Sequence, residues 1–215
     1  MIRSLLVVLA SVMLLGAART PAVVAYRLGV EPQAGRTPLL TVEIRLRGDT
    51  DGETRIDLPD SFASGREAWR NVEGFTAKGA SVMASAPAQR VLRHRPGARL
   101  TIRYRVRSAY DQDPQASERN PYRGAVIRPD WFAALGEFVF ATPAGREGDA
   151  ATLDLNRPPA GWQVASSVER GHVAPGLTAN DVAGSITMGS LHLDVAQRPI
   201  SGGSLRVATL AGGTL

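Results

Sequence analysis

The chain has 215 residues, of which 44% are hydrophobic and 21% are charged, a composition ordinary for a globular protein. It contains no cysteine, which excludes disulfide-stapled scaffolds, cysteine-ligated zinc and iron–sulfur clusters. The formal net charge is +5, and Lys78 is the only lysine, so arginine supplies 24 of the 25 basic residues. The arginines are spread along the chain and are not interleaved with aromatic residues in one segment, so we expect no nucleic-acid partner.

The first residues have the organisation of a secretory signal peptide. A short basic segment at residues 1–4 precedes an apolar run from Leu5 to Leu15, and small residues follow before Arg19. We therefore predict a signal peptide at residues 1–18 and a β-sandwich domain at residues 19–215, periplasmic or secreted. The alternative is an uncleaved membrane anchor, although this run is shorter than the roughly 20 residues that a spanning helix needs. After cleavage we expect no membrane span.

The rest of the chain alternates between apolar and polar residues with a period of two, which is typical of half-buried β-strands. The clearest examples are residues 40–46, 54–58 and 100–106. Glycine, proline and aspartate separate such segments at intervals of about ten residues. This pattern predicts an all-β fold, an antiparallel β-sandwich with at most one or two short helical turns.

Three other segments complete the predicted fold. Residues 130–135, between a proline and a glycine, are the best candidate for a helical turn. Residues 186–195 are expected to form a hairpin around Gly189. The polar residues 110–128 are expected to form a long loop over one end of the sandwich.

No local motif predicts a catalytic or metal site. The three histidines are His94, His172 and His192, and none belongs to the His-Glu-x-x-His motif of zinc peptidases. The Gly-x-Ser-x-Gly and Ser-x-x-Lys motifs of serine enzymes are absent as well. His192 and Asp194 would face the same side of a strand, but no third ligand is near them in sequence. We therefore predict no catalytic residue, no metal and no cofactor.

The sharpest charge pattern is a row of arginines on one predicted strand. Arg103, Arg105 and Arg107 alternate, so their side chains share one face of the sheet, and Arg99 lies just before them. Guanidinium groups bind carboxylates and phosphates with two parallel hydrogen bonds. This face is therefore a candidate docking surface for a carboxylate, a phosphate or an acidic partner domain.

Each candidate binding residue also has a structural alternative. The arginines could form a solvated strand face, paired across the sheet to Glu43 or Asp57, which would add little stability. Trp131 and Phe132 could anchor a partner as exposed aromatic residues. They could equally fill one end of the sandwich core.

A succession of short motifs also runs along the chain in a fixed order. The motifs are Tyr26-x-Leu-x-Val, Asp57-Leu58-Pro59, a Pro-Gly turn leading into the tyrosine-bearing strand within residues 94–106, Arg128-Pro129-Asp130-Trp131-Phe132, residues 159–167, and Gly202-Gly203-Ser204-Leu205. This succession resembles the N-terminal β-domain of the glycyl aminopeptidase family of zinc metallopeptidases, over most of residues 26–212.

The resemblance implies a β-sandwich of shared ancestry without the catalytic domain. In that family the β-domain precedes a thermolysin-like catalytic domain that carries His-Glu-x-x-His, and this chain ends near the point where that domain is expected. None of the three histidines can be assigned as a zinc ligand of the family. No catalytic residue is therefore transferred to this chain.

We expect an exported, non-catalytic module that docks a peptidase catalytic domain or a peptide or protein partner. The predicted docking residues are Arg99, Arg103, Arg105, Arg107, Trp131 and Phe132. Two alternatives stay open. One is a divergent hydrolase that uses His172 or His192 with nearby carboxylates, and the other is a structural protein of the cell envelope.

Overall fold

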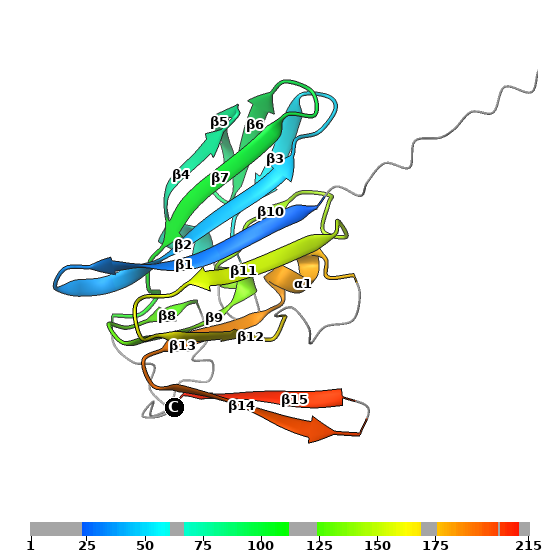
Figure 1. Cartoon of the computed structure of the whole chain (residues 1–215). Helices are drawn as coiled ribbons and strands as arrows, with labels where there is room; N and C mark the ends of the chain where they lie inside the picture. The colour runs from blue at the N-terminus through cyan, green and yellow to red at the C-terminus, as the bar shows by residue number, and fades with distance from the viewer. Residues whose placement is uncertain (1–22, 61–66, 112–123, 169–175, 202, 211–215) are drawn as a thin grey trace, which may run out of the picture.

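The structure is a computed structural model that describes residues 23–60, 67–111, 124–168, 176–201 and 203–210 (Figure 1). The described strands are β1 Val24–Gln33, β2 Arg36–Arg47, β3 Glu53–Asp57, β4 Val72–Lys78, β5 Ala80–Ala86, β6 Gln89–His94, β7 Arg99–Val106, β8 Val126–Ile127, β9 Trp131–Leu135, β10 Thr142–Pro143, β11 Ala151–Arg157, β12 Gln163–Ser166, β13 Ile186–Ser190, β14 Leu193–Ile200 and β15 Gly203–Leu210. The described helical elements are the 3-10 turns η1 Ala68–Asn71 and η2 Gly136–Phe138 and the α-helix α1 Ala179–Ala183. The predicted all-β class is confirmed.

The large sheet has the strand order β11-β1-β2-β7-β4. Its long strands form because apolar residues recur at every second position, as in β2, where Val42 and Ile44 are 2% and 1% exposed. Neighbouring strands are antiparallel, except that β1 pairs with β11 in parallel. A parallel pair requires a long crossover connection, and β1 and β11 are indeed far apart in the sequence.

The second sheet, in the order β10-β3-β6-β5, packs against the inner side of the large sheet. The shared core joins Ile44 and Ile102 of the large sheet with Ile56 and Leu92 of the second, none more than 1% exposed. These two layers form the upper part of the molecule in Figure 1.

A buried tyrosine ties the large sheet to the segment that follows η2. The hydroxyl of Tyr104 donates a hydrogen bond to the carbonyl of Val139 (2.8 Å) and accepts one from the N–H of Ala141 (2.7 Å). Tyr104 is 3% exposed, so water does not replace these bonds. The hydroxyl thus satisfies one buried backbone acceptor and one buried donor.

The third sheet, in the order β12-β13-β9-β8, corrects the prediction of a helical turn at residues 130–135. Residues Trp131–Leu135 form β9, which pairs with β13 on one side and β8 on the other. A short apolar segment between proline and glycine suits either a strand or a helical turn. Pairing with β13, more than fifty residues later in the chain, selects the strand.

The predicted hairpin around Gly189 is also wrong. Gly189 lies inside β13, between Phe132 of β9 and Val164 of β12. A Cβ atom at this position would lie 2.5 Å from the ring of Phe132, so glycine permits close packing here and does not mark a turn. The strand that follows, β14, pairs with β15 in a separate two-stranded sheet at the lower end of Figure 1.

The helix α1 begins at a capping box that the sequence analysis missed. The hydroxyl of Thr178 accepts a hydrogen bond from the N–H of Asp181 (3.2 Å), and the Asp181 carboxylate accepts one from the N–H of Thr178 (2.8 Å). Within the described ranges, no helix is long and apolar enough to cross a membrane.

Candidate docking surface

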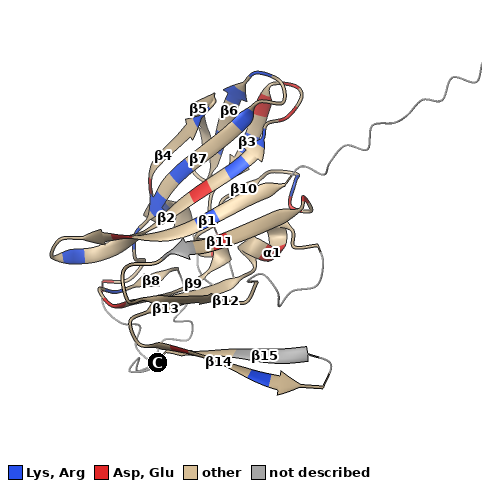
Figure 2. Cartoon of the chain, in the orientation of Figure 1, with Lys and Arg blue, Asp and Glu red and all other residues tan. Residues whose placement is uncertain are grey.

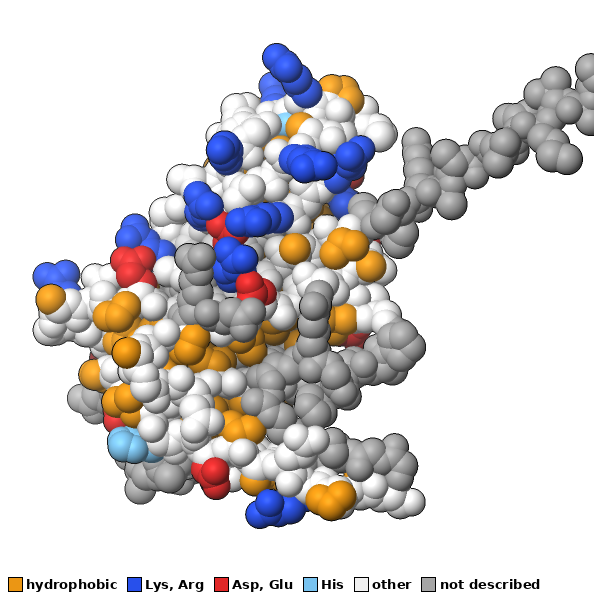
Figure 3. Space-filling model, viewed as in Figure 1, with side chains coloured by type: hydrophobic (Ala, Val, Ile, Leu, Met, Phe, Trp, Pro, Cys, Tyr) orange, Lys and Arg blue, Asp and Glu red, His pale blue; other side chains and the backbone are white. Residues whose placement is uncertain are grey.

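The outer face of the large sheet, turned away from the second sheet, carries a concentration of arginines (Figures 2 and 3). The strand alternation points Ile102 and Tyr104 into the core and leaves Arg103 and Arg105 outside. Arg107 follows directly after β7 and is exposed as well. We call this surface the arginine face and define it by Arg27, Arg45, Arg103, Arg105 and Arg107.

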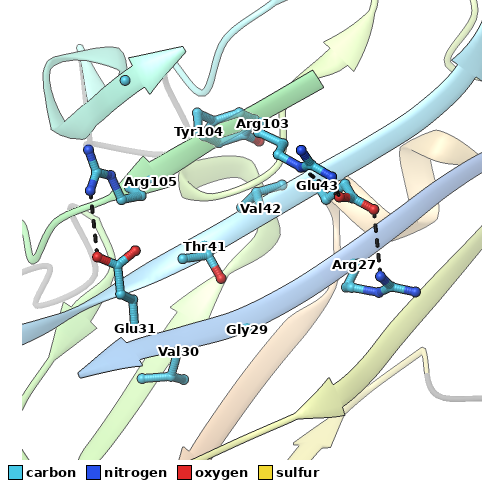
Figure 4. A pocket seen from close by; sticks show the side chains of 11 residues that line it. Arg27, Gly29, Val30, Glu31, Thr41, Val42, Glu43, Arg103, Tyr104 and Arg105 are labelled. Carbon is cyan, nitrogen blue, oxygen red and sulfur yellow. Dashed lines mark hydrogen bonds and ion pairs between the residues drawn. The ribbon is translucent and has the colours of Figure 1, made fainter. Parts of the chain in front are cut away.

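Glu43 lies at the centre of the arginine face, in a row of charged residues that crosses the sheet (Figure 4). The strand register places Arg27 between Asp154 and Glu43. On the next strand Arg103 lies opposite Glu43. Nη2 atoms of Arg103 and Arg45 each lie 2.7 Å from the Glu43 carboxylate, and Nη1 of Arg27 lies 3.6 Å from it. Acidic and basic groups therefore alternate across four strands.

The surrounding arginines keep Glu43 ionised. Its side chain is 14% exposed, and this burial by itself would raise the pKa of the carboxyl group. The hydrogen bond from Arg103 and the charges of Arg45 and Arg103 outweigh it and hold the pKa of Glu43 below its ordinary value. Three guanidinium groups around one carboxylate still have N–H donors left for a second acidic group.

Arg103, Arg105 and Arg107 each have an acidic neighbour and nevertheless remain exposed. Arg105 lies 3.5 Å from Glu31, and Arg107 lies 3.9 Å from Glu73. The exposed fractions of the three arginine side chains are 62%, 44% and 53%. The Arg105–Glu31 and Arg107–Glu73 pairs are exposed on both sides and contribute only about 0.2–1 kcal/mol each, so a competing partner carboxylate could replace them at little cost.

The remaining predicted arginine, Arg99, lies at the start of β7 and is also exposed on the outer face. The register places it opposite Arg47 of β2. Of the two acidic partners considered from the sequence, Glu43 is the one that pairs with this strand. Asp57 lies on β3 of the second sheet, where its carboxylate accepts a hydrogen bond from Gln89 (2.8 Å).

A shallow hollow of about 450 Å³ lies within the arginine face, lined in part by Arg27, Glu43, Arg103 and Arg105 (Figure 4). Gly74 of β4, with a φ of +62°, forms part of its wall, and a Cβ there would lie 3.3 Å from Nη2 of Arg105. Sequence reasoning missed Arg27 and the central role of Glu43. The alternation on each strand was visible, but only the register shows which residues meet.

The two predicted aromatic residues belong to the third sheet and not to the arginine face. Phe132 is fully buried and stacks on Trp162, with ring centroids 6.3 Å apart. It is therefore a core residue, the structural alternative considered for it. Trp131 is half-buried on β9, opposite Ser190 of β13.

The remaining sequence candidates do not converge on one place. His94 hydrogen-bonds to the buried hydroxyl of Thr54 (2.9 Å), and His192 is exposed just before β14. His172 and residues 112–123 of the predicted loop lie outside the described residues. Among the residues that the structure describes, no group of three or more histidine, aspartate or glutamate side chains is placed to hold a metal ion.

No family model and no curated protein matches the sequence. Solved structures do match the fold. An aminopeptidase N family protein from Idiomarina loihiensis superimposes with a TM-score of 0.66 at 15% identity, over 86% of this chain and 32% of that chain. The M1 zinc metallopeptidase from Deinococcus radiodurans gives a TM-score of 0.51 at 15% identity, over 89% and 47%. A mutant of that enzyme bound to a Tyr-Ser-Ala substrate gives 0.51 at 16%, over 89% and 48%.

These matches define the class of the fold. The chain has the fold of a part of the M1 zinc aminopeptidases, and the predicted resemblance to a β-domain of a zinc aminopeptidase is confirmed at the level of the fold. Identities of 15–16% support no closer statement. The chain spans about a third to a half of the length of these solved chains.

Proposed function

We propose that the chain is an exported, non-catalytic module that docks a peptidase catalytic domain or its peptide substrate through the arginine face. The observation that carries this proposal is the exposure of Arg103, Arg105 and Arg107 on one sheet face, where the acidic neighbours of Arg105 and Arg107 are 3.5 Å and 3.9 Å away and bind them only weakly. Arginine forms bidentate, directional bonds with carboxylates, so such a face suits recognition of an acidic surface.

The structural comparisons support the choice of partner class. The matched chains are an aminopeptidase N family protein and an M1 zinc metallopeptidase, and this chain accounts for only 32–48% of their length. A protein with a peptidase catalytic domain is therefore the first partner to test. One of the matched enzymes is a complex with a tripeptide substrate, which makes a peptide the second.

Site-specific photo-cross-linking in the native host tests the docking face. In one variant benzoylphenylalanine replaces Thr76 of β4, which lies opposite Arg103 of β7. In a control variant it replaces Ile186, which is 50% exposed on the third sheet. We expect Thr76 alone to yield a cross-linked partner that carries a peptidase domain or a peptide. Glutamine at Arg103, Arg105 and Arg107 together should remove that product. Equal products from both positions, or a product that survives the triple substitution, would refute the arginine face as the docking surface.

The non-catalytic assignment has its own test. The purified chain should release no product from aminoacyl-naphthylamide substrates, with or without added Zn²⁺. Turnover that is abolished by His192→Ala or His172→Ala would instead establish the hydrolase alternative. Export is tested by fusing residues 1–18 to alkaline phosphatase, and N-terminal sequencing of the exported chain should begin at Arg19.

A further inference from the structure

Arg47 and Arg99 form a like-charge pair at one end of the large sheet. They lie directly opposite each other in the β2–β7 register, and Cβ atoms of such pairs are about 4.5–5.5 Å apart on one face. Like charges in this arrangement destabilise a sheet. In the next row Thr101 lies opposite both Arg45 and Lys78, which adds two more cations to the same end of the outer face.

Asp49, Asp51 and Asp149 line the same hollow as this pair, and each binds another group. Nη1 of Arg146 lies 3.2 Å from Asp49, and Nη2 of Arg146 lies 2.8 Å from Asp149. The carboxylate of Asp51 accepts a hydrogen bond from a backbone N–H of its own turn (2.9 Å). Within the described part of the chain, no acidic side chain forms an ion pair with either arginine of the pair. This distinguishes the pair from Arg103, Arg105 and Arg107, each of which has an acidic neighbour.

Both arginines line a hollow on the outer face with a volume of about 1110 Å³. Its lining includes Arg47, Arg99 and Thr101 together with the apolar residues Val23 and Ala25. Asp49, Asp51 and Asp149 also line it, and Arg146 forms ion pairs with Asp49 and Asp149. Val23 is 44% exposed, so apolar surface is accessible next to the charge. A space of this size and mixed chemistry exceeds what a single phosphate fills and suits a side chain attached to a peptide.

We propose that Arg47 and Arg99 bind a carboxylate side chain of an acidic peptide segment that extends along this hollow. The inference rests on the proposed docking role and names the chemistry that its partner presents. A carboxylate between two guanidinium groups accepts hydrogen bonds from both and removes their mutual repulsion. The partner thus supplies an ion pair that no described acidic side chain forms with these two arginines, whereas at Arg103, Arg105 and Arg107 it must compete with an internal glutamate.

Binding is tested with a fluorescein-labelled peptide of alternating glutamate and alanine, by fluorescence anisotropy on the full chain. The same peptide with glutamine in place of glutamate is the neutral control. We expect Arg47→Gln and Arg99→Gln each to weaken binding about three- to ten-fold. The control variant Arg55→Gln, at an arginine on β3 of the second sheet that is 62% exposed, should weaken it less than two-fold. Inorganic phosphate at equal ionic strength should compete poorly.

Thermal unfolding provides a second readout that a failed fold would not mimic. Because each substitution removes a like-charge contact, Arg47→Gln and Arg99→Gln should keep or raise Tm, by up to about 3 °C, while they lose peptide binding. A lowered Tm in either variant, or peptide binding unchanged by both, would overturn the proposal.

The remaining outcomes separate this inference from the docking role itself. Binding that is lost only in Arg103, Arg105 and Arg107 variants would overturn the Arg47–Arg99 site and leave the arginine face as the docking surface. Effective competition by phosphate would overturn the assignment of a peptide carboxylate. Failure of the glutamate peptide to bind would overturn this inference alone, since the docking role is decided by cross-linking from Thr76.

Discussion

Replacing Tyr104 with phenylalanine should destabilise the fold by about 2–6 kcal/mol. The substitution keeps the ring, which stacks on Phe75 with centroids 5.9 Å apart, and removes only the hydroxyl. The carbonyl of Val139 and the N–H of Ala141 then lose a partner in a site that water does not reach. An unsatisfied buried group costs about 1–3 kcal/mol, and two are created. Typical domain stabilities of about 5–15 kcal/mol make this loss easy to measure.

Tyr26→Phe is the matched control for this measurement. Tyr26 is 1% exposed and packs edge-on against Phe140, but its hydroxyl has no hydrogen-bond partner among the described residues. Removing it should leave the free energy of unfolding unchanged or raise it by up to about 1 kcal/mol. Urea unfolding followed by tryptophan fluorescence, at constant m value, measures both variants. Equal losses in the two, or no loss in Tyr104→Phe, would refute the hydrogen-bond argument.

Four further predictions concern charge and packing. The fold lowers the pKa of Glu43, so the ionised carboxylate contributes to the free energy of unfolding above the ordinary glutamate value of about pH 4.3. This contribution is lost as the pH falls below that value. Glu43→Gln should therefore flatten this part of a profile of unfolding free energy recorded between about pH 3 and 7. Burial raises the pKa of Tyr104, so the protonated hydroxyl contributes to the free energy of unfolding below about pH 10, and this contribution is lost as the pH rises further. Tyr104→Phe should abolish this alkaline loss of stability. Phe132→Ala should cost about 3–5 kcal/mol in urea unfolding, and a loss below about 1 kcal/mol would place it outside the core. Gly189→Ala should cost about 1–3 kcal/mol by overpacking, less in a Phe132→Leu background, and a neutral effect would contradict the close contact.

The strands that the sequence predicted best are those with one buried and one solvated face. In β2 and β7, residues such as Val42 and Ile102 are buried, while the polar residues between them face outward. Period-two alternation predicts which side chains of such a strand are buried, since a shift of one residue would expose all of its apolar side chains. The layered all-β fold follows from several such strands.

The third sheet could not be predicted in the same way because its strands are short and its pairing is distant. Five apolar residues at β9 carry no clear period, and the flanking proline and glycine favoured a helix. In the sequence Gly189 resembles a turn residue, because the close approach of the Phe132 ring that requires glycine there is a tertiary contact. The helix α1 has only five residues, too few for a helical period, although Thr178 and Asp181 are visible in the sequence as a capping pair.

The candidate site shows the same division between local and distant information. Alternation along one strand placed Arg103 and Arg105 on one face, and this placement is observed. The position of Glu43 between Arg27 and Arg103, and of Arg47 opposite Arg99, depends on the register of three strands. A single sequence carries the first kind of information and not the second.

The two ends of the outer face should therefore contribute differently to docking. Around Glu43, a partner carboxylate exchanges one ion pair for another, so the net affinity gained is small and the main effects are on orientation and specificity. At Arg47 and Arg99 an incoming carboxylate displaces no ion pair of the described residues and also relieves repulsion, so this end should provide more of the binding free energy. Both contributions involve exposed charges and should weaken as salt rises, but only the second should disappear with Arg99→Gln.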